Sequence, residues 1–507
     1  MKSNKSILKS DTQQFNRYKF KQTATSLILI GILCFSALLT GCDVLSSDSY
    51  MTANYKINTE GIKNTEDGTL IENPIIKVED ESISTFSIDV DTASYVNFRR
   101  YIANMSLKKF QEEKYSIRTE EAINYFNYNY KKPAGDEIIA VNTMIGDCPW
   151  NTEAKLAVIT LAGKELVAAE QAGSNIVFLV DVSGSMNSPE RLPLLKESLT
   201  MAIEKLNEKD IVSIVTYASG VNTIISGVSA TEKEKIIKAL DALKPGGSTA
   251  GASGLNLAYS VAEDHFIKDG NNRIVLATDG DFNVGPSSVE EIKSIVTQKR
   301  QSGIFLTVLG FGVSYQSGDS RLEALADNGN GGYFVIDSIL EGEKVLCEQF
   351  TSTLYTIAKD VKVQVEFNVN TVESYRLIGY ENRLLSNEDF EDDSVDAGDM
   401  GAGHTVTAMY ELILKGDITD ELFAVKVRYK EPNSDESFLY EHTAQVNTSL
   451  PNDFYFAAAV AEACLVINDS KYKGSATLKK AYEAASEYSN GDIYRQNFVE
   501  ILKNLVE

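Results

Sequence analysis

Three closely spaced oxygen-bearing side chains, Asp181, Ser183 and Ser185, have the types and order of a metal-binding loop. They follow the apolar run at residues 176–180, where a strand would give way to a loop. Two later segments add oxygens, with Thr249 after a pair of glycines and Asp279 after a second apolar run. Carboxylates and hydroxyls without thiol or imidazole groups suit a hard cation, Mg²⁺ or Mn²⁺. The alternative is that these side chains only form turns and cap helices.

The surrounding sequence alternates between strands and helices, which favours an α/β domain with a Rossmann-like, mostly parallel sheet and helices on both faces. In such a sheet all three oxygen-bearing loops fall at carboxyl ends of strands, where open α/β sheets bind ligands. The predicted strands are residues 176–180, 211–217, 221–228, 273–278, 304–311 and 333–336. The predicted helices are residues 189–206, 235–243 and 252–266, with two more starting near residues 288 and 321.

Both flanks of this central domain (residues 172–346) contain short strands. The N-terminal flank (83–171) has two, and two strands are marginal in water. The C-terminal flank (347–450) has five, whereas a sandwich commonly needs about seven. We therefore expect one β-sandwich built from both flanks, with the α/β domain inserted and its two connections opposite the metal loops. Residues 451–507 are expected to be helical.

Asp89 and Asp91 follow a short apolar stretch in the N-terminal flank. Their spacing superficially resembles the Asp-x-Asp-x-Thr motif of aspartyl-nucleophile phosphatases, but Ala93 occupies the fifth position. The pattern therefore favours capping of the helix that follows.

The first 41 residues have the pattern of a secretory signal, with lysines before an apolar run at residues 27–39 that is too short to span a bilayer. The run ends in Leu39-Thr40-Gly41-Cys42, which resembles a bacterial lipobox. That resemblance implies cleavage before Cys42 and lipidation of its sulfur; the alternative is an uncleaved membrane anchor. Residues 42–82 are polar and are expected to form a flexible tether. We thus expect a lipid-anchored protein of the cell membrane that faces outside the cytoplasm.

Composition limits the choice of partner. The chain has 48 basic and 72 acidic residues, and removal of residues 1–41 leaves a net charge of −29. This balance argues against nucleic acid and against an anionic membrane surface as the direct ligand. Cys148, Cys347 and Cys464 are expected to be mostly buried thiols, although one disulfide is possible outside the cell.

The motifs "TFSIDVDTASYVNFRRYI", "DVSGSM", "TDGDFNVG" and "DAGDMGAGHTVTAMYEL" resemble the bacterial YfbK-like lipoproteins, which contain a von Willebrand factor type A (VWA) domain. The resemblance covers residues 83–507. It implies a metal-ion-dependent adhesion site with a Mg²⁺ or Mn²⁺ ion, and a binding role rather than catalysis. The partner would be a protein that offers an Asp or Glu carboxylate. There are two alternatives: a metal-dependent envelope hydrolase, and a structural envelope protein whose metal only stiffens the loops. The ligands implied by the resemblance are Asp181, Ser183, Ser185, Thr249 and Asp279.

Overall fold

The computed structural model describes residues 71–166, 173–248, 251–280, 289–312, 319–416, 421–444 except 433 and 435, and 449–506. The predicted signal, Cys42 and most of the tether lie outside these ranges. The last part of the predicted tether is folded, because Asn73 donates hydrogen bonds to the carbonyls of Leu377 and Gly379 at 3.2 and 2.7 Å. Strand β1 (Ile76–Lys77) then pairs with β12 (Val372–Ile378). None of the described helices is long and apolar enough to cross a bilayer.

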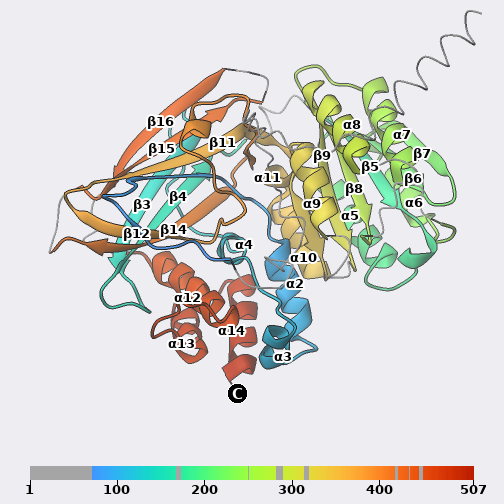
Figure 1. Cartoon of the computed structure of the whole chain (residues 1–507). Coiled ribbons are helices and arrows are strands. Elements are labelled where there is room, and N and C mark those ends of the chain that lie inside the picture. The colour runs from blue at the N-terminus through green and yellow to red at the C-terminus, as the bar shows by residue number, and fades with distance from the viewer. Residues whose placement is uncertain are drawn as a thin grey trace, which may run out of the picture. The chain divides into compact units, whose positions relative to one another are not determined.

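The central domain is built on a six-stranded sheet in the order β10-β9-β8-β5-β6-β7 (Figure 1). All neighbouring strands are parallel except β6 and β7, which pair antiparallel as a hairpin. The predicted mostly parallel α/β sheet is therefore confirmed. The strands are β5 (Ser174–Asp181), β6 (Ile211–Tyr217), β7 (Val221–Ser229), β8 (Asn271–Thr278), β9 (Ile304–Phe311) and β10 (Tyr333–Ile336).

Helices cover both faces of this sheet, and the alternation of side chains along β5 shows why. Val177 and Leu179 belong to the same hydrophobic cluster as Leu255 of α7, whereas Phe178 belongs to the cluster that contains Leu195 of α5. Successive residues of a strand point to opposite faces, so each face needs its own helical cover. The helices are α5 (Leu192–Lys205), α6 (Lys233–Asp241), α7 (Gly251–Asp264), α8 (Val289–Gln301), α9 (Asp319–Asn328) and α10 (Ile339–Glu343), followed by a π-helical turn (Lys344–Glu348) and α11 (Phe350–Leu354).

The two flanks together form one β-sandwich, as predicted. One sheet has the order β1-β12-β14-β4-β3, in which β4 from the N-terminal flank pairs antiparallel with β14 from the C-terminal flank. The other has the order β13-β11-β15-β16, and β2 of the N-terminal flank pairs with β11. The strands are β2 (Ile83–Ser87), β3 (Ile139–Asp147), β4 (Lys155–Gly163), β11 (Thr356–Phe367), β12 (Val372–Ile378), β13 (Gly398–Gly401), β14 (Thr405–Leu414), β15 (Phe423–Lys430) and β16 (Ser437–Ala444).

C-terminal helices cover the outer face of the first sheet (Figure 1). Ile159 of β4 packs into the core between the two sheets, while its neighbour Val158 packs with Phe454 and the other helical side chains. Burial on both faces explains why β4 is apolar almost throughout. The helices are α12 (Asn452–Ile467), α13 (Leu478–Tyr488) and α14 (Ile493–Val506).

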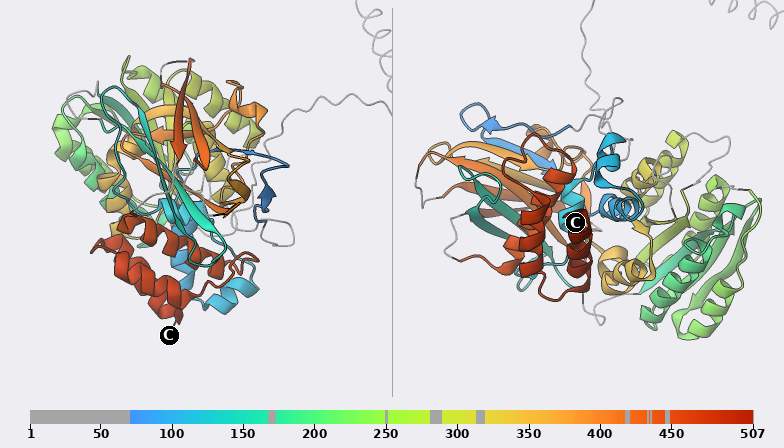
Figure 2. Two further views of the ribbon diagram at one scale, coloured as in Figure 1. Left: turned by 90° about the vertical axis from the view of Figure 1, so that its left-hand side faces the viewer. Right: turned by 90° about the horizontal axis from the view of Figure 1, so that it is seen from below.

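Three short helices of the N-terminal flank lie between these C-terminal helices and the α/β domain (Figure 2). They are α2 (Ala93–Ile102), α3 (Leu107–Glu112) and α4 (Thr119–Asn124).

The chain enters and leaves the α/β domain at one place. Ser174, the first residue of β5, lies with its hydroxyl 2.5 Å from the hydroxyl of Tyr355, the residue before β11. This junction is at the amino end of β5 and therefore opposite the loop that follows Asp181, as predicted. Cys148, Cys347 and Cys464 are free thiols in the described structure, and two of them are buried.

Candidate metal-binding site

Asp181 is the last residue of β5 and is wholly buried. One carboxylate oxygen accepts a hydrogen bond from the Ser183 amide at 2.8 Å, and the other accepts from the Thr278 hydroxyl at 3.3 Å. Burial raises the pKa of Asp181 and the nearby charge of Asp279 adds to the effect, while the bonds from Ser183 oppose it. The fold thus fixes the orientation of a carboxylate whose charge is costly unless a cation balances it.

The two predicted serine ligands meet in the turn after β5. The hydroxyl oxygens of Ser183 and Ser185 are 2.9 Å apart. Ser183 is buried and Ser185 is exposed, so the pair runs from the interior to the surface. Met186, the next residue, is wholly buried and anchors the turn in the core.

The glycine pair before Thr249 lies against this turn. The Gly184 amide donates to the Gly247 carbonyl at 3.0 Å, and the Gly246 amide donates to the Val182 carbonyl at 2.8 Å. Gly247 has a φ of +89°, and a Cβ atom there would lie 2.4 Å from the Ser219 hydroxyl, so the loop needs glycine at this position. The predicted ligand Thr249 itself lies outside the described residues.

Asp279 follows β8, the neighbour of β5 in the sheet. Because the two strands are parallel, their carboxyl ends bring the loops of Asp181 and Asp279 to the same edge. Thr278 links the loops through its hydroxyl bond to Asp181. Asp279 is 5% exposed. The structure therefore brings together four of the five predicted ligands.

Arg191 is a site residue that the sequence analysis missed. Its Nη1 donates to the carbonyl of Ser185 and to Oδ2 of Asp279, both at 2.7 Å. It lies just before α5 and six residues after Ser185, in a stretch without strand periodicity. In the sequence, Arg191 is visible only as a basic residue close to the predicted oxygen ligands. That pattern does not predict which carboxylate the arginine would contact.

The donor chemistry fits a hard divalent cation. Two carboxylates and two hydroxyls come together at this site. In the ranges that the structure describes, no group of three or more His, Cys, Asp or Glu side chains is placed to hold a metal. This oxygen-only set suits Mg²⁺ or Mn²⁺ better than a thiolate- or imidazole-bound metal.

Asp89 and Asp91 do not have the helix-capping role that the sequence predicted, and they belong instead to a second group of acidic residues. Neither caps α2, whose Ser94 amide instead donates to Glu121 at 2.7 Å. Asp91 accepts a hydrogen bond from the Tyr333 amide at 2.9 Å. Arg383 of the C-terminal flank lies between acids of the N-terminal flank and of α9, at 3.2 Å from Asp89, 3.6 Å from Asp91, 3.6 Å from Glu323 and 3.4 Å from Asp327.

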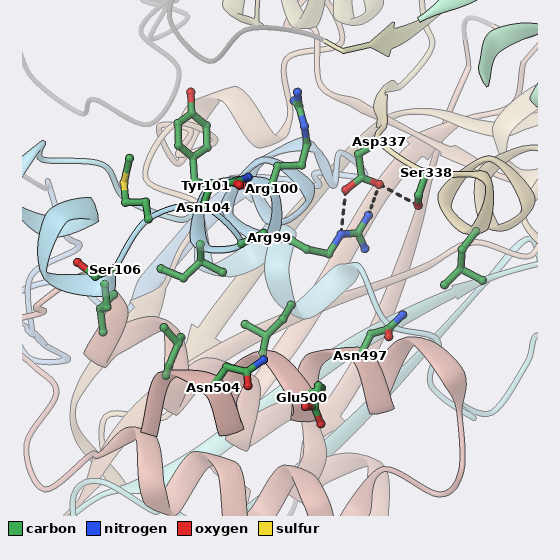
Figure 3. A pocket seen from close by; sticks show the side chains of 17 residues that line it. Arg99, Arg100, Tyr101, Asn104, Ser106, Asp337, Ser338, Asn497, Glu500 and Asn504 are labelled. Carbon is green, nitrogen blue, oxygen red and sulfur yellow. Dashed lines mark hydrogen bonds and ion pairs between the residues drawn. The ribbon is translucent and has the colours of Figure 1, made fainter. Parts of the chain in front are cut away.

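A groove of about 1060 Å³ lies where α2, the start of α10 and one face of α14 meet (Figure 3). At one side of it, Arg99 forms hydrogen bonds to both carboxylate oxygens of Asp337, at 3.1 and 2.6 Å. The lining mixes half-buried apolar side chains with Asn104, Asn497 and Asn504. No predicted ligand lines the groove.

Three family models match the chain along most of its length. The model described as "von Willebrand factor" matches residues 62–158, the von Willebrand factor type A domain matches residues 175–344, and the C-terminal domain of "Uncharacterized protein YfbK" matches residues 352–507.

Among curated proteins, the chain is 38% identical over 461 residues to the uncharacterized protein YfbK of Escherichia coli (strain K12), which covers 85% of this chain and 79% of that protein. It is also 31% identical over 146 residues to human inter-alpha-trypsin inhibitor heavy chain H3, but over only 16% of that protein. A solved von Willebrand factor type A protein from Catenulispora acidiphila covers 75% of this chain and 91% of its own, with 16% identity and a TM-score of 0.43. A mussel byssus protein, proximal thread matrix protein 1 with a zinc-occupied MIDAS motif, covers 35% of this chain and 45% of its own, with 23% identity and a TM-score of 0.30.

Proposed function

The chain belongs to the YfbK family, and we propose that it binds a protein partner through a divalent cation held by its VWA domain. Asp181, Ser183, Ser185 and Asp279, together with Thr249, would hold the ion directly or through water. When bound, the ion supplies positive charge and a coordination position for a carboxylate oxygen of the partner.

The observation that carries this proposal is the environment of Asp181. Its carboxylate is wholly buried, and no Lys or Arg of the described residues lies within ion-pair distance of it. A buried charge without a cationic partner costs free energy, and such groups are usually paired or bind metals. The serine hydroxyls beside it supply neutral oxygen ligands, so a divalent ion would balance the two aspartates without excess negative charge.

We further propose that the protein is held at the membrane through lipid on Cys42, with the VWA domain outside the cytoplasm. The support is the short apolar run followed by Leu-Thr-Gly-Cys. Several acyl chains on one residue would anchor the protein firmly. Cys42→Ser is expected to release the protein from the membrane fraction or to leave the precursor uncleaved, and a mature N-terminus elsewhere in mass spectra would contradict the assignment.

The test of metal-dependent binding compares the wild type with Asp181→Asn, which keeps the shape of the side chain but removes its charge. Calorimetry with MgCl₂ or MnCl₂ should show binding to the wild type and at least tenfold weaker binding to the variant, because one of two carboxylates is lost. Asp264→Asn changes an exposed aspartate at the end of α7 and serves as the matched control.

Cross-linking in the source cell, followed by pull-down in Mg²⁺ or EDTA, then identifies the partner. Partner recovery that depends on Mg²⁺ and is lost in Asp181→Asn supports the binding role. Metal binding that stiffens the loops without any Mg²⁺-dependent partner would favour the structural role, and turnover of phosphoester or peptide libraries would favour a hydrolase.

A further inference from the structure

Arg191 ties together three loops at the carboxyl edge of the VWA sheet. Nη1 donates hydrogen bonds to the Ser185 carbonyl and to Oδ2 of Asp279, both at 2.7 Å. Nη2 donates to the carbonyl of Gly312, just after β9, at 3.4 Å. The Arg191 side chain is 25% exposed and that of Asp279 is 2% exposed. The guanidinium therefore reaches from solvent to a carboxylate that is almost completely enclosed.

The third loop makes space for this side chain. Gly312 has a φ of +58°, and a Cβ atom at this position would lie 2.8 Å from Cγ of Arg191. Any larger residue at position 312 would displace the Arg191 side chain. The placement of Arg191 thus depends on the loop after β9 as well as on its own segment.

The charges of the site show what the Arg191 guanidinium would do. Asp181 and Asp279 carry two negative charges, and a divalent ion alone would neutralise them. Arg191 adds one positive charge in contact with Asp279. The loaded site would then have a net charge of about +1, which one carboxylate of a partner would cancel.

We propose that Arg191 is the specificity-determining residue of this site: it competes with the divalent ion for Asp279 and makes the loaded site select an acidic side chain. This inference rests on the proposed metal-dependent binding. The proposal requires that Arg191 weaken the binding of the metal ion and strengthen the binding of the partner's carboxylate, because its positive charge repels the first and attracts the second. A residue that only stiffened the loops would support both ligands in the same way.

The experiment uses the full mature chain with Mn²⁺ as the metal and acetate as the carboxylate probe. Arg191→Gln is expected to bind Mn²⁺ about tenfold more tightly than the wild type, since a charge a few ångströms away is removed. Acetate should tighten Mn²⁺ binding to the wild type, by the reciprocity of linked binding, and this gain should largely disappear in Arg191→Gln. Sodium chloride at equal ionic strength controls for screening.

Two further variants separate charge from packing. Arg191→Lys keeps the charge and should stay close to the wild type in both measurements. Arg428→Gln removes an arginine of the sandwich that pairs with Asp393 at 3.0 Å and is 23% exposed, and it should change neither.

Weaker or unchanged Mn²⁺ binding in Arg191→Gln, or an undiminished acetate effect, would overturn the role of Arg191 while leaving metal-dependent binding intact. A wild type that binds no Mn²⁺ would overturn the proposed function, and this inference with it.

Discussion

Glu120 shows how strongly single buried acids respond to their surroundings in this protein. It lies in α4 and is 1% exposed. Burial raises the pKa of Glu120 from 4.5 to about 8, and the negative charges of Glu381 and Asp89 add to the effect. Its protonated form is therefore favoured in the folded state.

This raised pKa predicts a pH-dependent effect of Glu120→Gln. An acid with a higher pKa in the folded state destabilises the fold as pH rises from its unfolded pKa to its folded pKa, here from 4.5 to about 8. The variant should match the wild type near pH 4 and be more stable by about 4 kcal/mol at pH 8, because each unit of the pKa difference is worth about 1.4 kcal/mol. Urea unfolding across this range is the measurement. Glu113→Gln, an exposed change in the same flank, should show no such trend.

Single residues also mark the limit of what local sequence patterns predict. Asp181, Ser183 and Ser185 were predicted as ligands because side chains two residues apart share one loop, and the structure brings Asp279 to the same edge. The role of Asp89 was predicted wrongly because its partner, Arg383, is 294 residues away in the sequence. Arg191 was missed because its contact with Asp279 depends on how three loops pack.

At the level of elements, an ionic cluster joins the N-terminal flank to the last helical segment of the VWA domain. Arg99 of α2 binds Asp337 at 2.6 Å (Figure 3). It also binds Glu341 of α10 at 2.9 Å. Tyr125 also donates to Glu341, at 2.7 Å. The Nζ atom of Lys344, which is almost fully buried, lies 4.7 and 4.2 Å from the ring centroids of Tyr125 and Tyr494. The start of α10 is thus fixed by the N-terminal flank, and the π-helical turn after it contacts α14.

Arg99→Ala is expected to lower the free energy of unfolding by about 3 kcal/mol, because it leaves the carboxylate of Glu341 buried without its main cation. Chemical denaturation measures the loss. Arg100→Ala, at the neighbouring position, should change stability by less than about 1 kcal/mol. Equal effects of the two variants would show that the Arg99 cluster does not stabilise the junction.

Elements with strong periodicity were predicted closely, and weak ones were not. All six strands of the VWA sheet lie within a few residues of their predicted positions, and the segment predicted to be helical, residues 451–507, contains α12, α13 and α14. Strands β1 and β13 have two and four residues, too few for a period-2 pattern, and they are held by pairing with β12 and β11. The shared sandwich was predicted by counting strands, because neither flank alone had enough for two sheets.

At the scale of the molecule, the VWA domain is an insertion whose two ends meet. Gly163 at the end of β4 lies beside Ile357 near the start of β11, and Ser174 hydrogen-bonds to Tyr355. The described contacts of α9 and α10 with the flanks include the ion pairs Arg99–Glu341, Arg118–Glu323 and Arg383–Asp327. Once the flanks are removed, water can solvate the charged groups that these ion pairs leave behind, whereas a newly exposed apolar core would gain no such hydration. This arrangement separates the VWA domain, which contains the candidate metal site, from the sandwich that carries it.

The insertion predicts that residues 173–355 fold without the flanks. All strands of the six-stranded sheet lie within this range, and its ends are adjacent in space, so excision breaks no strand pair of that sheet. The fragment should unfold cooperatively and bind Mn²⁺ within about threefold of the full chain, because Asp181, Asp279 and Arg191 are all retained. Residues 350–450 alone should stay unfolded, since β14 loses its partner β4 and β11 loses its partner β2. Thermal unfolding and Mn²⁺ calorimetry on both fragments test this. A folded 350–450 fragment would show that the C-terminal strands do not need the N-terminal flank, and an unfolded 173–355 fragment would show that the VWA domain depends on its ionic contacts with the sandwich.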